Sequence, residues 1–194
     1  MITVRQIERL WENRQYDRLT SDLLGSRGED SPHLRSSLSG SLPAAALALI
    51  RLDELNQLHA PLSQKLIRRL LVSQSADGGW DDPLSTALCA RALISTGGQG
   101  IAIDRALAHL ADLQKSDGIW PKEPIRRLSA DAYVSAFILF QLGGNAQFRD
   151  AVRLLDAVSW FERHEAELDD DTRRLWELAS LKCRIRQVQA LVWS

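Results

Sequence analysis

The stretch Gln74-Ser-Ala-Asp-Gly-Gly-Trp80 recurs forty residues later as Gln114-Lys-Ser-Asp-Gly-Ile-Trp120. A sequence that repeats itself at a period of about 20–50 residues is typical of proteins built from stacked, similar units. We therefore expect at least two structurally equivalent junctions in this chain. The residues that we assign to the motif are Gln74, Asp77, Gly79, Trp80, Gln114, Asp117, Gly118 and Trp120.

Each copy of the motif ends an amphipathic stretch and precedes an apolar one. Residues 66–74 and 103–114 place apolar side chains along one face at helical spacing. Residues 43–52, 83–94 and 133–142 are apolar nearly all round, which indicates helices that are covered on most sides. This order predicts an all-α fold with about eight helices, in which stacked hairpins place apolar helices inside and amphipathic helices outside.

A third amphipathic helix is predicted from residue 148 to about residue 163, aligned with the second at an offset of 45 residues. On this alignment the third junction is degenerate. Trp160 lies forty residues after Trp120 but is not the tryptophan of a third copy. The Gly-Gly pairs at 97–98 and 143–144 should end the apolar helices before them, with a glycine at positive φ.

The motif residues have a structural interpretation. Gln74 and Gln114 continue the apolar stripes of their helices, so their amides should point inward and need hydrogen-bond partners. The nearest candidates are the unpaired N–H groups at the start of the next helix or in its flanking loop. An Asp-Gly turn with glycine at positive φ lets the tryptophan fold back over the amide. We expect a structural clasp; the alternative is that Trp80 and Trp120 line a ligand site.

The Gln-x-x-Asp-Gly-x-Trp pattern resembles the QW repeat of squalene and hopene cyclases, whose architecture also occurs in protein prenyltransferase β subunits. The resemblance covers about residues 40–165. It implies an α/α toroid, in which the N-terminal ends of the inner helices surround the mouth of an apolar cavity. The chain supplies about four hairpins, too few for a closed ring, so a partial α/α toroid is expected. Residues 1–194 would form one domain, with a lead-in at 1–40, repeats at about 41–165 and a C-terminal capping helix at about 170–192.

The resemblance also points to candidate acids. Class II terpene cyclases protonate an alkene with an aspartic acid in an Asp-x-Asp-Asp-Thr motif. Aligned on that motif, Asp170 is a candidate, although Leu168 replaces the first aspartate. Asp82 and Asp131 precede predicted inner helices and are two further candidates at the cavity mouth. The simpler interpretation is that these acids cap helix N-termini. A third is that they form an acidic mouth that attracts a cationic or Mg²⁺-bearing partner.

Two functions therefore stand open. The first is a non-catalytic binding or scaffold module, which needs no cofactor. The second is a small terpene-cyclase-like or prenyltransferase-like enzyme with an isoprenoid cavity between the inner helices, which would use Mg²⁺. The residues expected to line that cavity are Thr86, Cys89, Tyr133 and Phe137. No metal site is predicted, because the zinc ligands implied by the prenyltransferase resemblance are lacking and the histidines show no ligand spacing.

Composition narrows the class of protein. The chain has 194 residues, a net charge of −1 and a pI near 6.4, which argues against a nucleic-acid partner. The N-terminus lacks the order of a signal peptide, and the longest apolar run, 42–50, is too short to span a bilayer. Cys89 and Cys183 do not form a disulfide framework. These features predict a cytoplasmic protein without a transmembrane segment.

The N-terminal end of the stack is expected to be an interface. Ile7, Leu10 and Trp11 give a predicted N-terminal helix an apolar edge, and the stretch 42–50 behind it is apolar throughout. Exposed apolar faces of that size are rare on monomers. We therefore expect a homodimer, or a partner protein, bound through the N-terminal helices.

Overall fold

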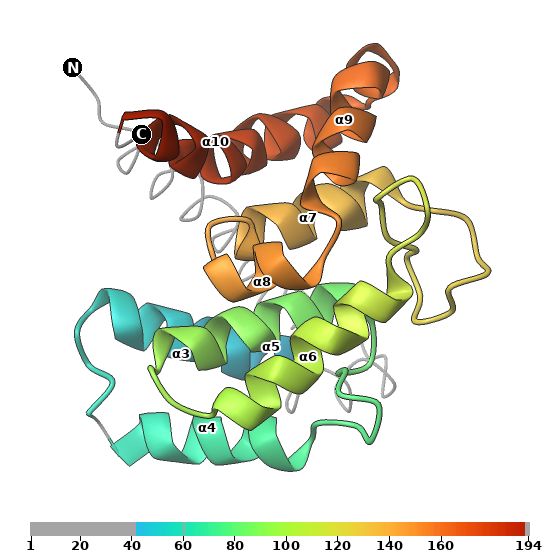
Figure 1. Cartoon of the computed structure of the whole chain (residues 1–194). Helices are drawn as coiled ribbons and strands as arrows, with labels where there is room; N and C mark the ends of the chain where they lie inside the picture. Colours follow the sequence, from blue (N-terminus) through green and yellow to red (C-terminus); the bar gives the residue numbers. More distant parts are fainter. Residues whose placement is uncertain (1–41, 60, 193–194) are drawn as a thin grey trace, which may run out of the picture. The chain divides into compact units, whose positions relative to one another are not determined.

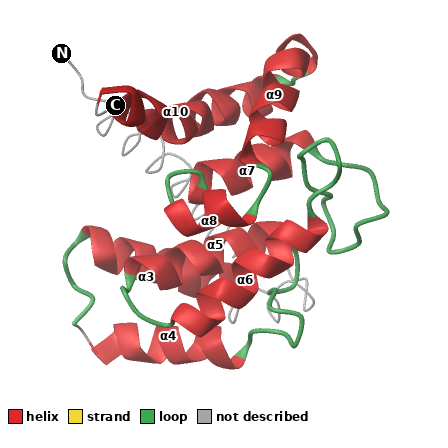
Figure 2. Ribbon diagram, in the orientation of Figure 1, coloured by secondary structure: helices red, strands yellow, loops and turns green. Residues whose placement is uncertain are grey.

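The structure is a computed structural model that describes residues 42–59 and 61–192, with side chains up to residue 183. The predicted N-terminal interface around Ile7, Leu10 and Trp11 lies outside these residues. The all-α class is confirmed for the described residues, which contain eight α-helices, no strand and one isolated β-bridge (Figures 1 and 2). The helices are α3 (Leu42–Glu54), α4 (Pro61–Val72), α5 (Pro83–Ser95), α6 (Gly100–Leu113), α7 (Ala132–Leu142), α8 (Ala146–Ala151), α9 (Leu154–His164) and α10 (Asp170–Val192).

The helices of the described residues are arranged in two layers. The helices α3, α5, α7 and α10 each pack on the next and form an inner row, whereas α4 packs on α3 and α6 packs on α5. Nine of the thirteen residues of α5 are buried, compared with two of the twelve residues of α4. The predicted division into apolar inner helices and amphipathic outer helices is therefore observed. The partial toroidal arrangement stays a prediction.

The helix α10 occupies the fourth position of the inner row. It packs on α7, and the rings of Phe161 in α9 and Trp176 in α10 stack with their centroids 4.4 Å apart. Its buried face includes Leu175, Trp176 and Ala179. The helix spans the range in which the sequence predicts a C-terminal capping helix, and it is the last helix of the inner row.

The third amphipathic helix is not continuous, and this part of the prediction is wrong. Residues 146–164 form two helices, α8 and α9, separated at Val152 and Arg153. The break occurs where the side chain of Gln114 hydrogen-bonds to both the N–H and the carbonyl of Arg153. Trp160 lies inside α9, which confirms that it is not a loop tryptophan.

The two Gly-Gly pairs differ from one another. Gly97 has a φ of 68°, as predicted for a glycine after a helix. Gly143 instead has a helical φ of −58°, so the prediction of a positive φ is wrong there. A Cβ atom at Gly143 would lie 2.7 Å from Cys183 Sγ and 2.5 Å from the carbonyl oxygen of Leu139. Contacts with the last turn of α7 and with Cys183 of α10, rather than φ, require this glycine.

Candidate functional site

The two copies of the motif form the same loop. Ser75 N–H donates to the Gly79 carbonyl at 3.0 Å, and Lys115 N–H donates to the Ile119 carbonyl at 3.0 Å. The turn glycines have φ values of 94° at Gly78 and 93° at Gly118. The predicted Asp-Gly turn is therefore confirmed in both copies.

Each turn glycine lies against the backbone of an outer helix. A Cβ atom at Gly78 would be 2.4 Å from the carbonyl oxygen of Arg105 in α6, and one at Gly118 would be 2.3 Å from the backbone nitrogen of Ala157 in α9. Position 118 thus requires glycine both because its φ is positive and because a side chain would meet the backbone of α9. Position 79 requires glycine only because of its neighbour, since a Cβ there would lie 2.6 Å from Nε2 of the buried His109.

These contacts define which outer helices are equivalent. The motif loop meets Ala102 and Arg105 in the first copy, and Arg153 and Asp156 in the second. Both pairs are 51 positions apart in the sequence. The offset of 45 residues predicted for the third amphipathic helix is therefore wrong, because α8 is an insertion before the true counterpart of α6, which is α9.

The amide of Gln114 is buried and fully bonded. Its Nε2 donates to the carbonyls of Gly118 at 2.7 Å and Arg153 at 3.2 Å, and its Oε1 accepts from Arg153 N–H at 2.8 Å. A backbone N–H at a helix start is therefore the partner, but the helix differs from the prediction: the next helix in the chain is α7, whereas the donor Arg153 stands at the start of α9. Gln74 makes only the two equivalent donations, to Gly78 and Ala102, both at 2.9 Å. No described residue donates a hydrogen bond to Gln74 Oε1, so the predicted N–H partner is not found among the described residues at the first junction.

The tryptophans are structural. Trp80 Nε1–H donates to the Leu70 carbonyl at 2.9 Å, and Trp120 Nε1–H donates to the Leu110 carbonyl at 2.7 Å. These carbonyls belong to the last turns of α4 and α6, which lack a full set of intrahelical partners. Both side chains are at most 1% exposed. The indoles therefore cap the outer helices, which supports the clasp over a ligand site.

Two hydroxyl groups, on Thr86 and Ser135, complete the clasp. This role was not predicted from the sequence for either residue. Trp80 N–H donates to Thr86 Oγ1 at 2.9 Å, and this hydroxyl lies 2.9 Å from the Asp82 carbonyl. Trp120 N–H donates to Ser135 Oγ at 2.8 Å, and that hydroxyl donates to the Asp131 carbonyl at 2.7 Å. In both copies the hydroxyl stands four residues after the aspartate. That spacing inside an apolar helix is the signal that could have identified them.

The candidate acids cap helices. Asp82 accepts from Ser85 N–H at 2.8 Å, Asp131 from Val134 N–H at 2.9 Å, and Asp169 from Thr172 N–H at 2.9 Å. The backbone and hydroxyl hydrogen bonds from Thr172 lower the pKa of Asp169 below its ordinary value. The capping interpretation is thus confirmed, but for the Leu168–Thr172 motif the capping acid is Asp169. The side chain of Asp170 is 82% exposed and pairs with Arg173 at 3.1 Å.

The four residues predicted to line a cavity differ in their surroundings. Thr86 and Cys89 are fully buried, Phe137 is half-buried and Tyr133 is 40% exposed. Burial, and then the charges of Asp81 and Asp82, raise the pKa of Cys89 to about 12. Burial, and then the charges of Asp171 and Asp169, raise the pKa of Tyr133. The hydroxyl of Thr86 is engaged in the clasp, where it bonds to Trp80 N–H and to the Asp82 carbonyl. A cavity lined by these residues stays a prediction.

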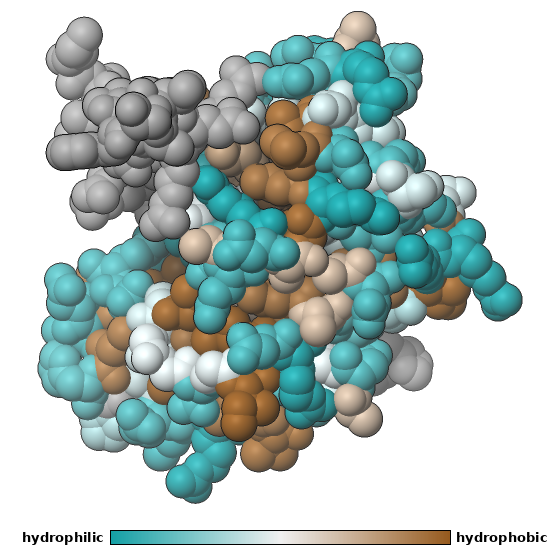
Figure 3. Space-filling model, viewed as in Figure 1, coloured by the Kyte–Doolittle hydropathy of each residue, from teal (hydrophilic) through white to brown (hydrophobic). Residues whose placement is uncertain are grey.

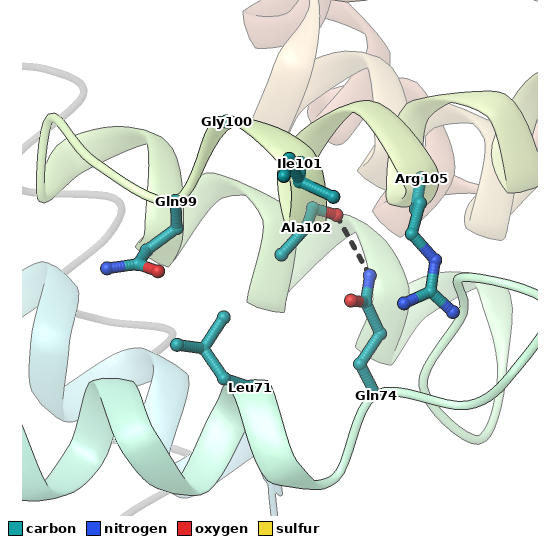
Figure 4. A pocket seen from close by; sticks show the side chains of 7 residues that line it. All are labelled: Leu71, Gln74, Gln99, Gly100, Ile101, Ala102 and Arg105. Carbon is teal, nitrogen blue, oxygen red and sulfur yellow. Dashed lines mark hydrogen bonds between the residues drawn. The ribbon is translucent and has the colours of Figure 1, made fainter.

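Two grooves between described residues lie on the outer layer. One, of about 350 Å³, separates the end of α4 from the start of α6 (Figure 4); its lining residues are Leu71, Gln74, Gln99, Gly100, Ile101, Ala102 and Arg105. The other, of about 370 Å³, lies between α6 and α8; its lining residues are Asp104, Leu107, Ala108, Ala111, Asp112, Gln147 and Ala151. Neither groove includes the predicted cavity residues or the candidate acids.

Within the described part of the chain, no group of three or more His, Cys, Asp and Glu side chains is placed to hold a metal ion. No described helix combines the length and the apolar character needed to cross a membrane. Comparison with protein-family models, curated proteins and solved structures finds no match to this chain.

Proposed function

We propose that this chain is a non-catalytic helical-repeat module of the partial α/α-toroid type, which acts as a binding module or scaffold. The observation that carries the proposal is the use of its aspartates. Asp82, Asp131 and Asp169 each accept the N–H of the residue three positions later, at the start of an inner helix. A carboxylate held in this way stabilises a helix N-terminus as an anion and is poorly suited to donate a proton.

The motif residues support the same proposal. The indoles of Trp80 and Trp120 bond to the outer helix that precedes them, and the amides of Gln74 and Gln114 bond to their own loop and to the following outer helix. Their contacts join outer helices to inner ones, as expected of residues that maintain a stack of repeats. The surface of such a stack remains available for partners. We place the module in the cytoplasm, where the buried thiols of Cys89 and Cys183 would stay reduced.

The competing function is a terpene-cyclase-like or prenyltransferase-like enzyme. A direct test incubates the purified full-length chain with squalene and with farnesyl and geranylgeranyl diphosphates, with and without Mg²⁺, and follows products by mass spectrometry. We expect no turnover. Turnover that Asp131→Asn or Asp170→Asn abolishes, while a melting curve shows the variant to be folded, would overturn the proposal.

A homodimer stays part of the proposal. Its expected contacts, around Ile7, Leu10 and Trp11, lie outside the described residues. Sedimentation of the full-length chain, compared with Trp11→Glu, measures it directly. A monomer whose behaviour is unchanged by Trp11→Glu would remove the dimer from the proposal.

A further inference from the structure

The groove between α4 and α6 has apolar walls and a polar floor. Leu71 and Ile101 line it from the two helices, and the amide of Gln74 lies to one side, bonded to Ala102 and next to Arg105 (Figure 4). Ile101 is 81% exposed. In the space-filling view, apolar side chains reach the surface in the region of α4 and α6, between hydrophilic ones (Figure 3). An exposed apolar side chain beside an unfilled groove is a feature of interaction sites.

The polar floor holds an acceptor without a donor. Gln74 Nε2 is bonded to Gly78 and Ala102, but Gln74 Oε1 receives no hydrogen bond from a described residue. In Figure 4 this oxygen faces the space between Leu71 and the start of α6. A segment that enters the groove would therefore find one acceptor already oriented toward it.

At the second junction an additional helix lies beside the equivalent space, although a groove of about 370 Å³ remains between α6 and α8. There the chain inserts α8 before α9, and the N–H of Arg153 reaches Gln114 Oε1 at 2.8 Å. Phe148 of α8 is fully buried, with its ring centroid 6.2 Å from that of Trp120. The connection from α5 to α6 is only the four residues 96–99 and has no such helix. Among the described residues, nothing therefore plays the part of α8 at the first junction.

The charges around the groove indicate the sign of its occupant. Arg105 lines the groove from α6, and its guanidinium, which donates to the Ser75 and Ala76 carbonyls, places a positive charge at the edge of the groove. Arg68 lies one turn before Leu71 on α4. An acidic side chain on the occupant would be attracted to this edge, which favours encounter and fixes orientation.

We propose that the α4–α6 groove binds a short amphipathic segment of a partner protein, one or two helical turns long. The segment places an aromatic or large aliphatic side chain between Leu71 and Ile101, offers a backbone N–H to Gln74 Oε1 and carries an acidic residue toward Arg68 and Arg105. This is recognition of a helix in a groove. It rests on the proposed function, because it names the surface and the partner class of a binding module.

The test uses the chain's own filler segment as the probe. A fluorescein-labelled synthetic peptide with the sequence of residues 145–153 and the change Arg149→Glu is titrated with the full-length protein, and its anisotropy is recorded. We expect saturable binding that weakens in high salt. In the protein, Ile101→Asp should weaken it at least tenfold, or about 1.4 kcal/mol. Val72→Asp, at an equally exposed apolar position outside the groove, should change it by less than about twofold.

Two matched peptides test the chemistry of the occupant. A peptide with Phe148→Ser in addition should lose binding, because it lacks the side chain for the apolar walls. A peptide that keeps Arg149 should bind several-fold more weakly, because it presents a cation to a basic edge. Equal binding of all three peptides would overturn the proposal.

Other outcomes would also overturn it. Failure to saturate at about 1 mM protein, or an equal loss with Ile101→Asp and Val72→Asp, would mean that the groove does not bind such a segment. A dimer that Ile101→Asp dissociates would assign the groove to a second copy of the chain. Absent peptide binding together with a lower melting temperature for Ile101→Asp would assign it to the chain's own residues. None of these results changes the turnover assay, so the failure of this inference and of the proposed function can be told apart.

Discussion

The junctions at Gln74 and Gln114 have the same loop, the same indole cap and the same hydroxyl, but different surroundings. At the second junction α8 is inserted, Arg153 N–H satisfies the glutamine oxygen, and Gln114 is only 1% exposed. At the first junction the connection is short, and Gln74 borders an open groove. The motif therefore holds an outer helix to its neighbour without requiring the space beside it to be filled. Substitutions made in pairs, one at each junction, can separate these two roles.

The largest effects are expected at the turn glycines. In Gly118→Ala and in Gly78→Ala the new Cβ would meet helix backbone at a positive φ, so each should cost about 3 kcal/mol of unfolding free energy or more. Gly97→Ala is the control, because Gly97 has a similar φ but no atom within 4 Å of its Cβ position. It should cost about 1 kcal/mol. Urea unfolding measures all three. A mild Gly78→Ala beside a severe Gly118→Ala would show that the two backbones are less alike than the structure describes.

The glutamines come next and should separate the junctions. Gln114→Leu removes three hydrogen bonds from a buried site and leaves the Arg153 N–H without its acceptor, so we expect a loss of about 1–3 kcal/mol. Gln74→Leu removes two from a half-buried site and should cost about 1 kcal/mol. If thermal or urea unfolding shows equal losses of stability in the two variants, the proposed difference between the junctions is contradicted. If neither variant loses stability, the clasp itself is contradicted.

Removal of the clasp hydroxyl should have a similar effect on stability at the two junctions. Thr86→Val and Ser135→Ala each leave a buried tryptophan N–H without its acceptor, and each should cost about 1–3 kcal/mol. Ser95→Ala is the control, because the Ser95 hydroxyl bonds only to a carbonyl within its own helix, and it should change stability by less than about 0.5 kcal/mol. An effect at only one of the two clasps, in the same unfolding assay, would show that the hydroxyl is not a shared part of the motif.

Local sequence was sufficient for much of this arrangement. The Asp-Gly turns, the capping role of Asp82 and the inner and outer helices follow from turn chemistry, capping preference and periodicity. Thr86 could also have been found, because a hydroxyl in an apolar helix four residues after a capping aspartate recurs as Ser135.

The errors all arise where distant residues decide local structure. The apolar stripe across Val152 and Arg153 gives no sign of a break, because the break is made by Gln114, which is 39 residues away in sequence. Gly143 was interpreted by its place after a helix, although a Cβ there would meet the distant Cys183 as well as the nearby Leu139 carbonyl. No periodicity encodes such contacts, since they depend on which helices become neighbours.

The smallest effects concern the acids that precede α10, where one is a cap and its neighbour is not. Asp169→Ala should cost about 1 kcal/mol, because it removes the acceptor for Thr172 N–H. Asp170→Asn should cost about 0.5 kcal/mol or less, because it removes only an exposed pair with Arg173.

The pKa of Asp169 is lower in the folded protein than its ordinary value of 3.8. Its contribution is therefore complete above that ordinary value and is lost as the pH falls through the lower, folded pKa. Urea unfolding at pH 7 and again below pH 4 should accordingly show the penalty of Asp169→Ala shrinking in acid, while Asp170→Asn stays close to the parent at pH 7. A larger penalty for Asp170→Asn than for Asp169→Ala would contradict the assignment of Asp169 as the helix cap. Asp170 would then again be a candidate catalytic acid.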